Sequence, residues 1–170
     1  MIAVVRRPLQ EQEIEALVSD IRLYPSLIYV ARSRLAHFKT PYVLEDGGAF
    51  IGICATYEFG HWVKLGPFVL LKKFHGKGYG KILLTKVVGD YAKKNIYVTS
   101  SHIAVQKIIE QLGFKEIRNV FSLPFPVKLF LLKQLHEHLH WDAVIEFMRK
   151  KLTMKSGVRK YYIKHAIVNT

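Results

Sequence analysis

The sequence FVLLKKFHGKGYGK, residues 68–81, decides the fold. Residues 68–71 form an apolar strand, residues 74–80 a glycine loop, and a helix is expected to open at Lys81. Glycines at alternate positions of the loop allow positive φ angles and let an anion approach the backbone closely. A helix start adds unpaired N–H groups and the positive end of the helix dipole. The sequence therefore predicts a cradle for a diphosphate.

Two common nucleotide-binding motifs do not fit this loop. The last glycine is not followed by the Lys-Ser/Thr pair of a P-loop. The first glycine, Gly76, does not directly follow the strand as it does in a dinucleotide-binding fingerprint. The loop therefore belongs to another class of phosphate-binding site.

A second segment, SHIAVQKIIEQLGF at 101–114, reads as a helix. Ser100 or Ser101 is the expected N-cap, and Gly113 stands where a left-handed residue ends a helix. The apolar residues recur at helical spacing and predict one buried face, made of Val105, Ile108, Ile109 and Leu112.

The two segments together, roughly residues 68–117, resemble motifs A and B of the GNAT superfamily of N-acetyltransferases. Motif A is Arg/Gln-x-x-Gly-x-Gly/Ala, and residues 75–80 match it with His75 in the first place. Motif B has an Asn where this chain has His102 and a Tyr where it has Ile109. In the family that Tyr often protonates the leaving thiolate of coenzyme A (CoA), so the usual general acid is missing here.

The resemblance implies an α/β (α+β) fold with a mixed central sheet of about six or seven strands. Helices flank the sheet, and one parallel pair of strands splays apart. We expect a single domain over residues 1–170, with a helical insertion at about 122–156 before the last strand.

The pattern along the chain agrees with this fold. Residues 2–5 are a strand, and Ile14, Leu17, Val18 and Ile21 mark the buried side of a helix, with a second helix expected at 27–37. Residues 41–45 and 49–57 predict a hairpin with a glycine turn, and residues 58–61 connect it to a strand at 62–71. Gly66-Pro67 interrupts that strand and predicts a bulge. Residues 96–99 predict the parallel neighbour, and residues 159–167 the final strand.

The resemblance also implies the cofactor contacts. Acetyl-CoA is the expected co-substrate, with no metal, and its pantetheine arm is expected to bind the backbone at 68–70. The expected contacts are Phe68, Val69, Leu70, His75, Gly76, Lys77, Gly78, Tyr79, Gly80, Lys81, His102 and Val105.

Direct acetyl transfer needs a deprotonated amine and stabilisation of the oxyanion and the thiolate. Glu58 and His61 precede the bulged strand, where the family often places its base. His102 is the leading candidate for the acid. Ser101 and the tyrosines Tyr161 and Tyr162 are the other candidates.

Composition bounds the remaining choices. One cysteine, Cys54, excludes an internal disulfide framework, and no apolar run reaches membrane-spanning length, so we expect a cytoplasmic protein. The net charge of +13 suits acidic partners, nucleic acid included, as well as a solvated basic surface. The histidines at 136, 138 and 140 do not complete a zinc ligand set.

The function expected from the sequence is transfer of an acetyl group from acetyl-CoA to an unidentified amine, on a small molecule or a protein. The alternative is a weak or inactive GNAT module that binds CoA or a polyanion such as tRNA or DNA. The sequence leaves the acceptor open, and it leaves a homodimer open as well.

Overall fold

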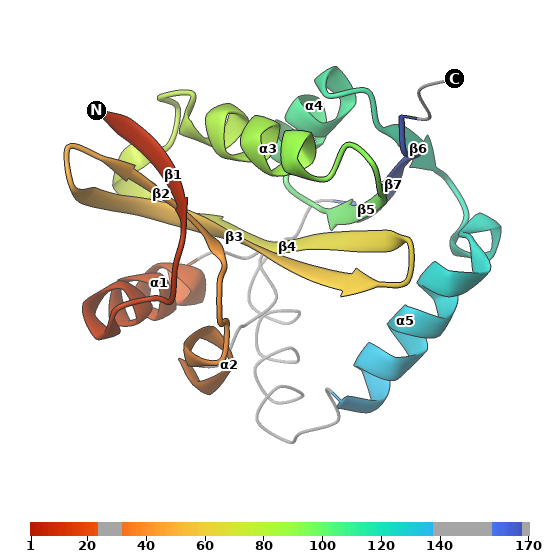
Figure 1. Ribbon diagram of the computed structural model, residues 1–170, viewed down its shortest axis with the longest axis horizontal. Coiled ribbons are helices and arrows are strands. Elements are labelled where there is room, and N and C mark those ends of the chain that lie inside the picture. The colour runs from red at the N-terminus through yellow and green to blue at the C-terminus, as the bar shows by residue number, and fades with distance from the viewer. Residues whose placement is uncertain (24–31, 138–157, 168–170) are drawn as a thin grey trace.

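The computed structural model describes residues 1–23, 32–137 and 158–167. Within these residues seven strands form one sheet in the order β1-β2-β3-β4-β5-β7-β6 (Figure 1). Among these seven described strands only the β4–β5 pair is parallel, which confirms the mixed sheet expected from the sequence. The strands are β1 (Ile2–Arg6), β2 (Tyr42–Asp46), β3 (Ala49–Phe59), β4 (Trp62–Leu70), β5 (Asn95–Ser100), β6 (Lys115–Ile117) and β7 (Lys160–Lys164).

Helices cover both faces of the sheet (Figure 1). On one face α3 (Tyr79–Asp90) and α4 (Ile103–Gln111) pack over the centre of the sheet, and on the other lie α1 (Glu11–Leu23), α2 (Arg32–Ala36) and α5 (Phe125–Glu137). Three apolar clusters fill the space between these layers, one under α3 and α4, one under α1 and one under α5. The described residues also form two short 3-10 helices, η1 (Lys72–Phe74) and η2 (Val120–Ser122).

The predicted helical faces are largely confirmed. Ile14, Leu17, Val18 and Ile21 of α1 are all buried. The described part of the second predicted helix is α2, while residues 24–31 lie outside the described residues. Of the predicted insertion, α5 is present between β6 and β7 in chain order, and the helix expected to follow it lies outside the described residues.

Two helix starts differ from the prediction. Helix α3 begins at Tyr79 rather than at Lys81, because Gly78 takes a left-handed conformation (φ 81°) and acts as the N-cap. Helix α4 has His102 rather than Ser100 or Ser101 as its N-cap. The Ser100 hydroxyl oxygen instead accepts the N–H of His102 at 3.1 Å, one step before the helix.

In the hairpin, Glu58 and Phe59 belong to β3 rather than to the connection.

The bulge expected at Gly66-Pro67 is present. Cys54 pairs with Phe68 and Thr56 with Leu65, so Ala55 alone stands opposite two residues of β4. The parallel pairing of β4 with β5 runs only from Trp62↔Asn95 to Leu65↔Val98. The bulge therefore marks the point beyond which the two strands are no longer joined.

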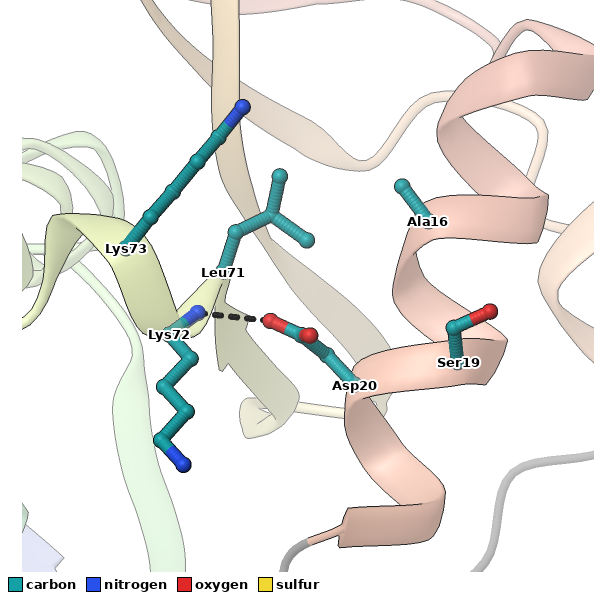
Figure 2. Close-up of a pocket in the computed structure, with 6 residues that line it drawn as sticks. All are labelled: Ala16, Ser19, Asp20, Leu71, Lys72 and Lys73. Atoms are coloured by element: carbon teal, nitrogen blue, oxygen red, sulfur yellow. Dashed lines mark hydrogen bonds between the residues drawn. The ribbon is translucent and has the colours of Figure 1, made fainter.

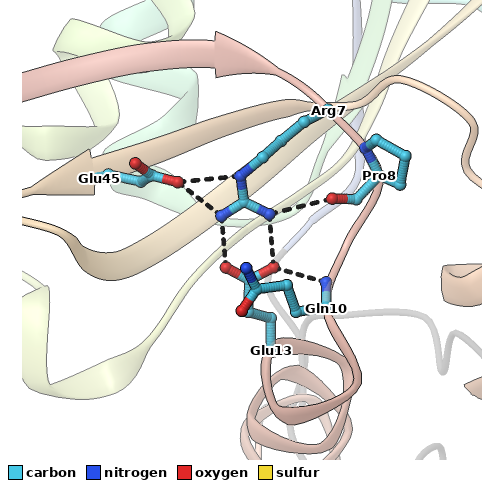
Figure 3. A network of polar contacts seen from close by, with 5 residues as sticks. All are labelled: Arg7, Pro8, Gln10, Glu13 and Glu45. Atoms are coloured by element: carbon cyan, nitrogen blue, oxygen red, sulfur yellow. Dashed lines mark hydrogen bonds and ion pairs between the residues drawn. The ribbon is translucent and has the colours of Figure 1, made fainter.

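Arg7 joins the start of α1 to the sheet (Figure 3). Its guanidinium donates to Glu13 at 2.5 and 2.8 Å, to Glu45 at 2.5 and 3.0 Å, and to the carbonyl of Pro8 at 3.0 Å. Glu13 is buried, and burial raises the pKa of its carboxyl. The bonds from Arg7 and from the Gln10 N–H outweigh this and hold that pKa below 4.5. The network fixes the start of α1 against β2. Helix α1 lines one side of the hollow described below.

Replacing Arg7 tests this network. Arg7→Met leaves the buried Glu13 without its cation, and we expect the free energy of unfolding at pH 7 to fall by about 3 kcal/mol. Because the folded pKa of Glu13 lies below its unfolded value, its stabilisation is present above about pH 4.5 and is lost as the pH falls through the folded pKa. The difference between wild type and variant should therefore shrink in acid, as urea unfolding at several pH values would show.

Arg32→Met is the matched control. Arg32 bonds Glu11 and Glu15, but all three side chains are more than half exposed. An exposed ion pair contributes about 0–1 kcal/mol. Equal losses from the two substitutions at pH 7 would contradict the role given to Arg7.

Candidate active site

The site begins at the free edge of β4 beyond the bulge. The Leu71 N–H donates to the Ile51 carbonyl at 2.9 Å, which makes Ile51 and Leu71 a hydrogen-bonded pair of the antiparallel ladder. Alternation along the ladder then directs the N–H and C=O groups of Phe68 and Leu70 away from β3. These groups face the side where β5 no longer pairs, so the slot between the strands is lined with backbone donors and acceptors.

Close packing with β3 holds this part of β4 in place. Gly52 lies opposite Leu70, and a Cβ atom at Gly52 would stand 2.2 Å from the Val69 carbonyl oxygen and 2.7 Å from the Leu70 Cα. No side chain fits there without moving β4. The requirement for glycine at this position therefore protects the geometry of the slot.

The glycine loop follows directly. Gly76 and Gly78 have φ angles of 77° and 81°, which strain any residue with a side chain. The N–H of His75 donates to Lys72 O and that of Lys81 to Gly78 O. Between them, the five backbone N–H groups of residues 76–80 have no acceptor among the described residues. Five successive N–H groups without an acceptor among the described residues, at the start of α3, have an arrangement suited to an anion, and anion binding by this loop stays a prediction.

His75 does not extend away from the strand. Its Nε2 lies 3.0 Å from the carbonyl oxygen of Leu70, so the ring stays close to the backbone at the end of β4. Two lysines of the loop lie over one aromatic ring: Nζ of Lys73 is 5.1 Å and Nζ of Lys77 5.6 Å from the centre of the Phe74 ring. These exposed cations make the surroundings of the cradle positive.

A hollow of about 520 Å³ lies between α1 and the start of the loop (Figure 2). Asp20 accepts the N–H of Lys72 at 2.6 Å, and the side chains of Lys72 and Lys73 diverge on either side of it (Figure 2). This bond fixes the exit of the chain from β4, so α1 helps to set the start of the loop. The hollow is lined by Ala16, Ser19, Asp20, Leu71, Lys72 and Lys73.

The two residues expected to supply a base lie at the hairpin end of β4. Glu58 accepts the Tyr91 hydroxyl at 3.0 Å and pairs with the ammonium of Lys94, which holds the pKa of its carboxyl below the usual value. His61 is exposed, and its carbonyl accepts the N–H of Asn95. Glu58, opposite Val63, is about 7 Å along the strands from the level of Leu65, where the slot opens, and His61 is about 13 Å from it.

The residues expected on the other wall of the slot lie at or near the start of α4. His102 is exposed at the N-cap and Val105 is half-buried, packed against the cluster under α3 and α4. Ile109 is buried in the same cluster, so it contributes packing only. The Tyr162 hydroxyl donates to Glu110 at 2.9 Å and is already engaged, whereas Tyr161 is half-buried on the opposite face under α5.

The structure adds two residues that the sequence analysis missed. Lys64 and Tyr97 are partners in the parallel pairing, one step before the strands separate, on the face covered by α5. Burial, with the charges of Arg34 and Arg159, lowers the pKa of the Lys64 ammonium to about 8. The only sequence signal was a single lysine within the apolar run at 62–71.

The sheet is mixed and its parallel pair separates, and a glycine loop follows at the start of α3. This combination is typical of the acyl-CoA-dependent transferase class of folds. The model of the acetyltransferase (GNAT) family matches residues 9–114, more than half of the 170 residues. The chain belongs to this family. A comparison with curated protein sequences returns no match.

Solved structures agree on the fold. The chain is similar to N-acetylglutamate synthase from Neisseria gonorrhoeae in complex with coenzyme A and N-acetyl-glutamate (TM-score 0.65, 14% identity), covering 99% of this chain and 36% of that one. This chain thus spans about a third of the synthase. A ribosomal-protein-alanine N-acetyltransferase from Escherichia coli gives a TM-score of 0.63 at 12% identity, with 99% and 97% of the two chains covered. A GNAT-family acetyltransferase from Staphylococcus aureus gives 0.62 at 14%, with 97% and 99% covered.

The described residues hold no metal-ligand cluster and no membrane-spanning helix. Among them no group of three or more His, Cys, Asp or Glu side chains is placed to hold a metal ion. No helix in the same part of the chain combines the length and apolarity needed to cross a membrane.

Gly78→Ala tests the anion cradle. An alanine held at the φ of Gly78 costs about 1–2 kcal/mol, and relief of that strain turns the loop N–H groups away from a common point. We expect the Kd for CoA, measured by isothermal titration calorimetry, to rise about tenfold.

Gly89→Ala in the same helix is the control. A Cβ at Gly89 meets no atom within 4 Å and its φ is not positive, so alanine should stabilise α3 by about 0.5–1 kcal/mol and leave the Kd for CoA unchanged. Identical CoA affinity for the two variants would contradict the assignment of the cradle to this loop.

Proposed function

We propose that the protein is an acetyl-CoA-dependent N-acetyltransferase that transfers the acetyl group directly to an amine acceptor. The observation that carries the proposal is the continuity of the slot and the cradle. Backbone groups of Phe68 and Leu70 face the open edge of β4, and the five N–H groups that follow at residues 76–80 have no acceptor in the described part of the chain. The spacing suits an extended arm that ends in a diphosphate.

The acetyl thioester would then lie where β4 and β5 separate, beyond Leu65 and Val98. A free N–H of Phe68 or Leu70 is placed to stabilise the oxyanion that forms on the thioester carbonyl. Attack by the neutral amine forms the C–N bond, and the C–S bond then breaks. The amine proton leaves to a base, and the CoA thiolate takes up a proton.

Acid–base roles are proposed for three side chains. His102, four residues past Val98 and exposed at the start of α4, is proposed to protonate the thiolate in place of the missing tyrosine. Glu58 or His61 is proposed to receive the amine proton, through water because of their distance from the slot. The lowered pKa of Glu58 keeps it ionised at neutral pH.

The second candidate function is a GNAT-fold module that binds CoA or a polyanion without catalysis. It is favoured by the burial of Ile109 where the family has its tyrosine, and by the net charge of +13. This candidate predicts CoA binding without acyl transfer, or a salt-sensitive shift of tRNA or DNA on a gel.

Calorimetry and thiol release test the proposal together. We expect a Kd for acetyl-CoA between about 1 µM and 1 mM, and amine-dependent release of CoA thiol across a panel of acceptors. His102→Gln should lower kcat about 100-fold with the Kd for acetyl-CoA unchanged. Glu58→Gln and His61→Gln, measured alongside, identify the base by the same criterion.

Two outcomes decide against transfer. Absence of acetyl-CoA binding at high micromolar concentration would remove both the transferase and the CoA-binding module. Tight binding with no thiol release from any amine would leave the non-catalytic module as the function.

A further inference from the structure

Four residues lie around the ammonium of Lys64 on the face of the sheet that α2 and α5 cover. With Lys64 they form what we call the Lys64 cluster: Arg34, Tyr57, Lys64, Phe130 and Gln134. Lys64 donates to the amide oxygen of Gln134 at 2.7 Å, and its Nζ lies 5.7 Å from the centres of both the Tyr57 and Phe130 rings. Gln134 is itself buried. The ammonium is thus held in one place, by neutral partners.

Among the described residues, the charges that act on this ammonium are positive. Arg34 donates to the Tyr57 hydroxyl at 3.1 Å, and the charges of Arg34 and Arg159 both act on Lys64. Among the described residues no carboxylate pairs with Lys64. A partly buried cation beside like charges is costly unless an anion joins it.

A second, independent group points to the same place. Tyr97 is fully buried, and its hydroxyl has no hydrogen-bond partner among the described residues. It is the β5 partner of Lys64 and lies under α5 with it, and the charge of Arg159 acts on both side chains. The Lys64 ammonium has a neutral acceptor but no carboxylate, and the hydroxyl on the neighbouring strand has no acceptor among the described residues, so an anion would satisfy both groups.

The position relates this pair to the reaction. Lys64 and Tyr97 form the last pair but one before β4 and β5 separate, and the thioester is proposed to lie just beyond. Both lie on the face covered by α5, and α5 and α3 lie on opposite faces of the sheet (Figure 1). A molecule that meets the thioester from this face would pass the Lys64 cluster.

We propose that Lys64, with Tyr97 and Arg159, binds an oxyanion carried by the amine acceptor. The acceptor class is therefore an amine with a carboxylate or a phosphate close to it, such as a free amino acid or a phosphorylated amine. That the bound molecule is an acetyl acceptor rests on the proposed function. That the cluster binds an anion rests on its geometry alone. The lysine and tyrosine supply donors to the oxyanion while the amine points to the slot.

The direct test follows the Lys64 side chain in the full chain by ¹³C NMR of labelled lysine. In chloride its pKa should be about 8, and acetate or inorganic phosphate at matched ionic strength should raise it, because a bound anion favours the ammonium. Exposed lysines such as Lys77 serve as internal controls and should not shift. A Lys64 pKa that is the same in chloride, acetate and phosphate would overturn the proposal, and the anion that acts at lower concentration separates carboxylate from phosphate.

Gln134→Glu offers a sharper variant. It places a carboxylate where the Gln134 oxygen already lies 2.7 Å from Nζ, so the pKa of Lys64 should rise without added anion and the response to acetate or phosphate should disappear. A retained response would show that the anion binds elsewhere and would contradict the proposal.

Matched acceptors test the link to transfer. With acetyl-CoA as donor, the acceptors that carry an oxyanion, L-alanine and O-phosphoethanolamine, are compared with L-alaninamide and ethanolamine, which carry none. Lys64→Met should raise KM about 10- to 100-fold for L-alanine and O-phosphoethanolamine only. Lys64→Arg should recover part of the loss. Equal losses for charged and uncharged acceptors would overturn the acceptor class. An NMR response to anions without any transfer would count against the proposed function and support the anion site.

Discussion

The separation of β4 from β5 is the constraint on which the rest of this structure depends. Ala55 faces two residues of β4, and the parallel pairing stops at Leu65↔Val98. Backbone groups that a regular sheet would bury in hydrogen bonds are thereby left free at the centre of the molecule. Such groups are costly to leave unpaired, so the edge is suited to an extended ligand with amide groups of its own.

The surrounding elements hold this opening at a fixed width. Gly52 allows β3 to approach β4 to a distance that no side chain permits, Asp20 of α1 fastens the chain where it leaves β4, and Arg7 fastens α1 to β2. On the far side Ile109 anchors α4 in the core. The site is thus built on packed strands and helices, which hold functional groups more accurately than loops do.

Charge is divided between the two faces of the sheet. The cradle at residues 76–80 uses neutral backbone donors, with lysines around it, on the side of α3. The Lys64 cluster holds two side-chain cations, Lys64 and Arg34, on the face that α2 and α5 cover. We propose that one face binds a diphosphate and the other a smaller anion, which would give part of the net charge of +13 a local use.

Most of the fold was predictable from the sequence, because it is encoded in local signals. The glycines of the loop and of the β2–β3 turn, the interruption at Gly66-Pro67 and the apolar periodicity of α1 each dictate one conformation. The helix starts were missed by one or two residues, since Ser100 bonds the backbone just before the helix it was expected to cap. Lys64 and Tyr97 could not be found, because their importance comes from pairing between strands and from α5, which is distant in sequence.

A crystal structure with acetyl-CoA bound tests the central claim most directly. We predict the diphosphate within hydrogen-bond distance of the N–H groups of residues 76–80, and the pantetheine arm bonded to Phe68 and Leu70 in the gap beyond Leu65 and Val98. A cofactor bound elsewhere, or β4 and β5 joined by hydrogen bonds past Leu65, would contradict the account.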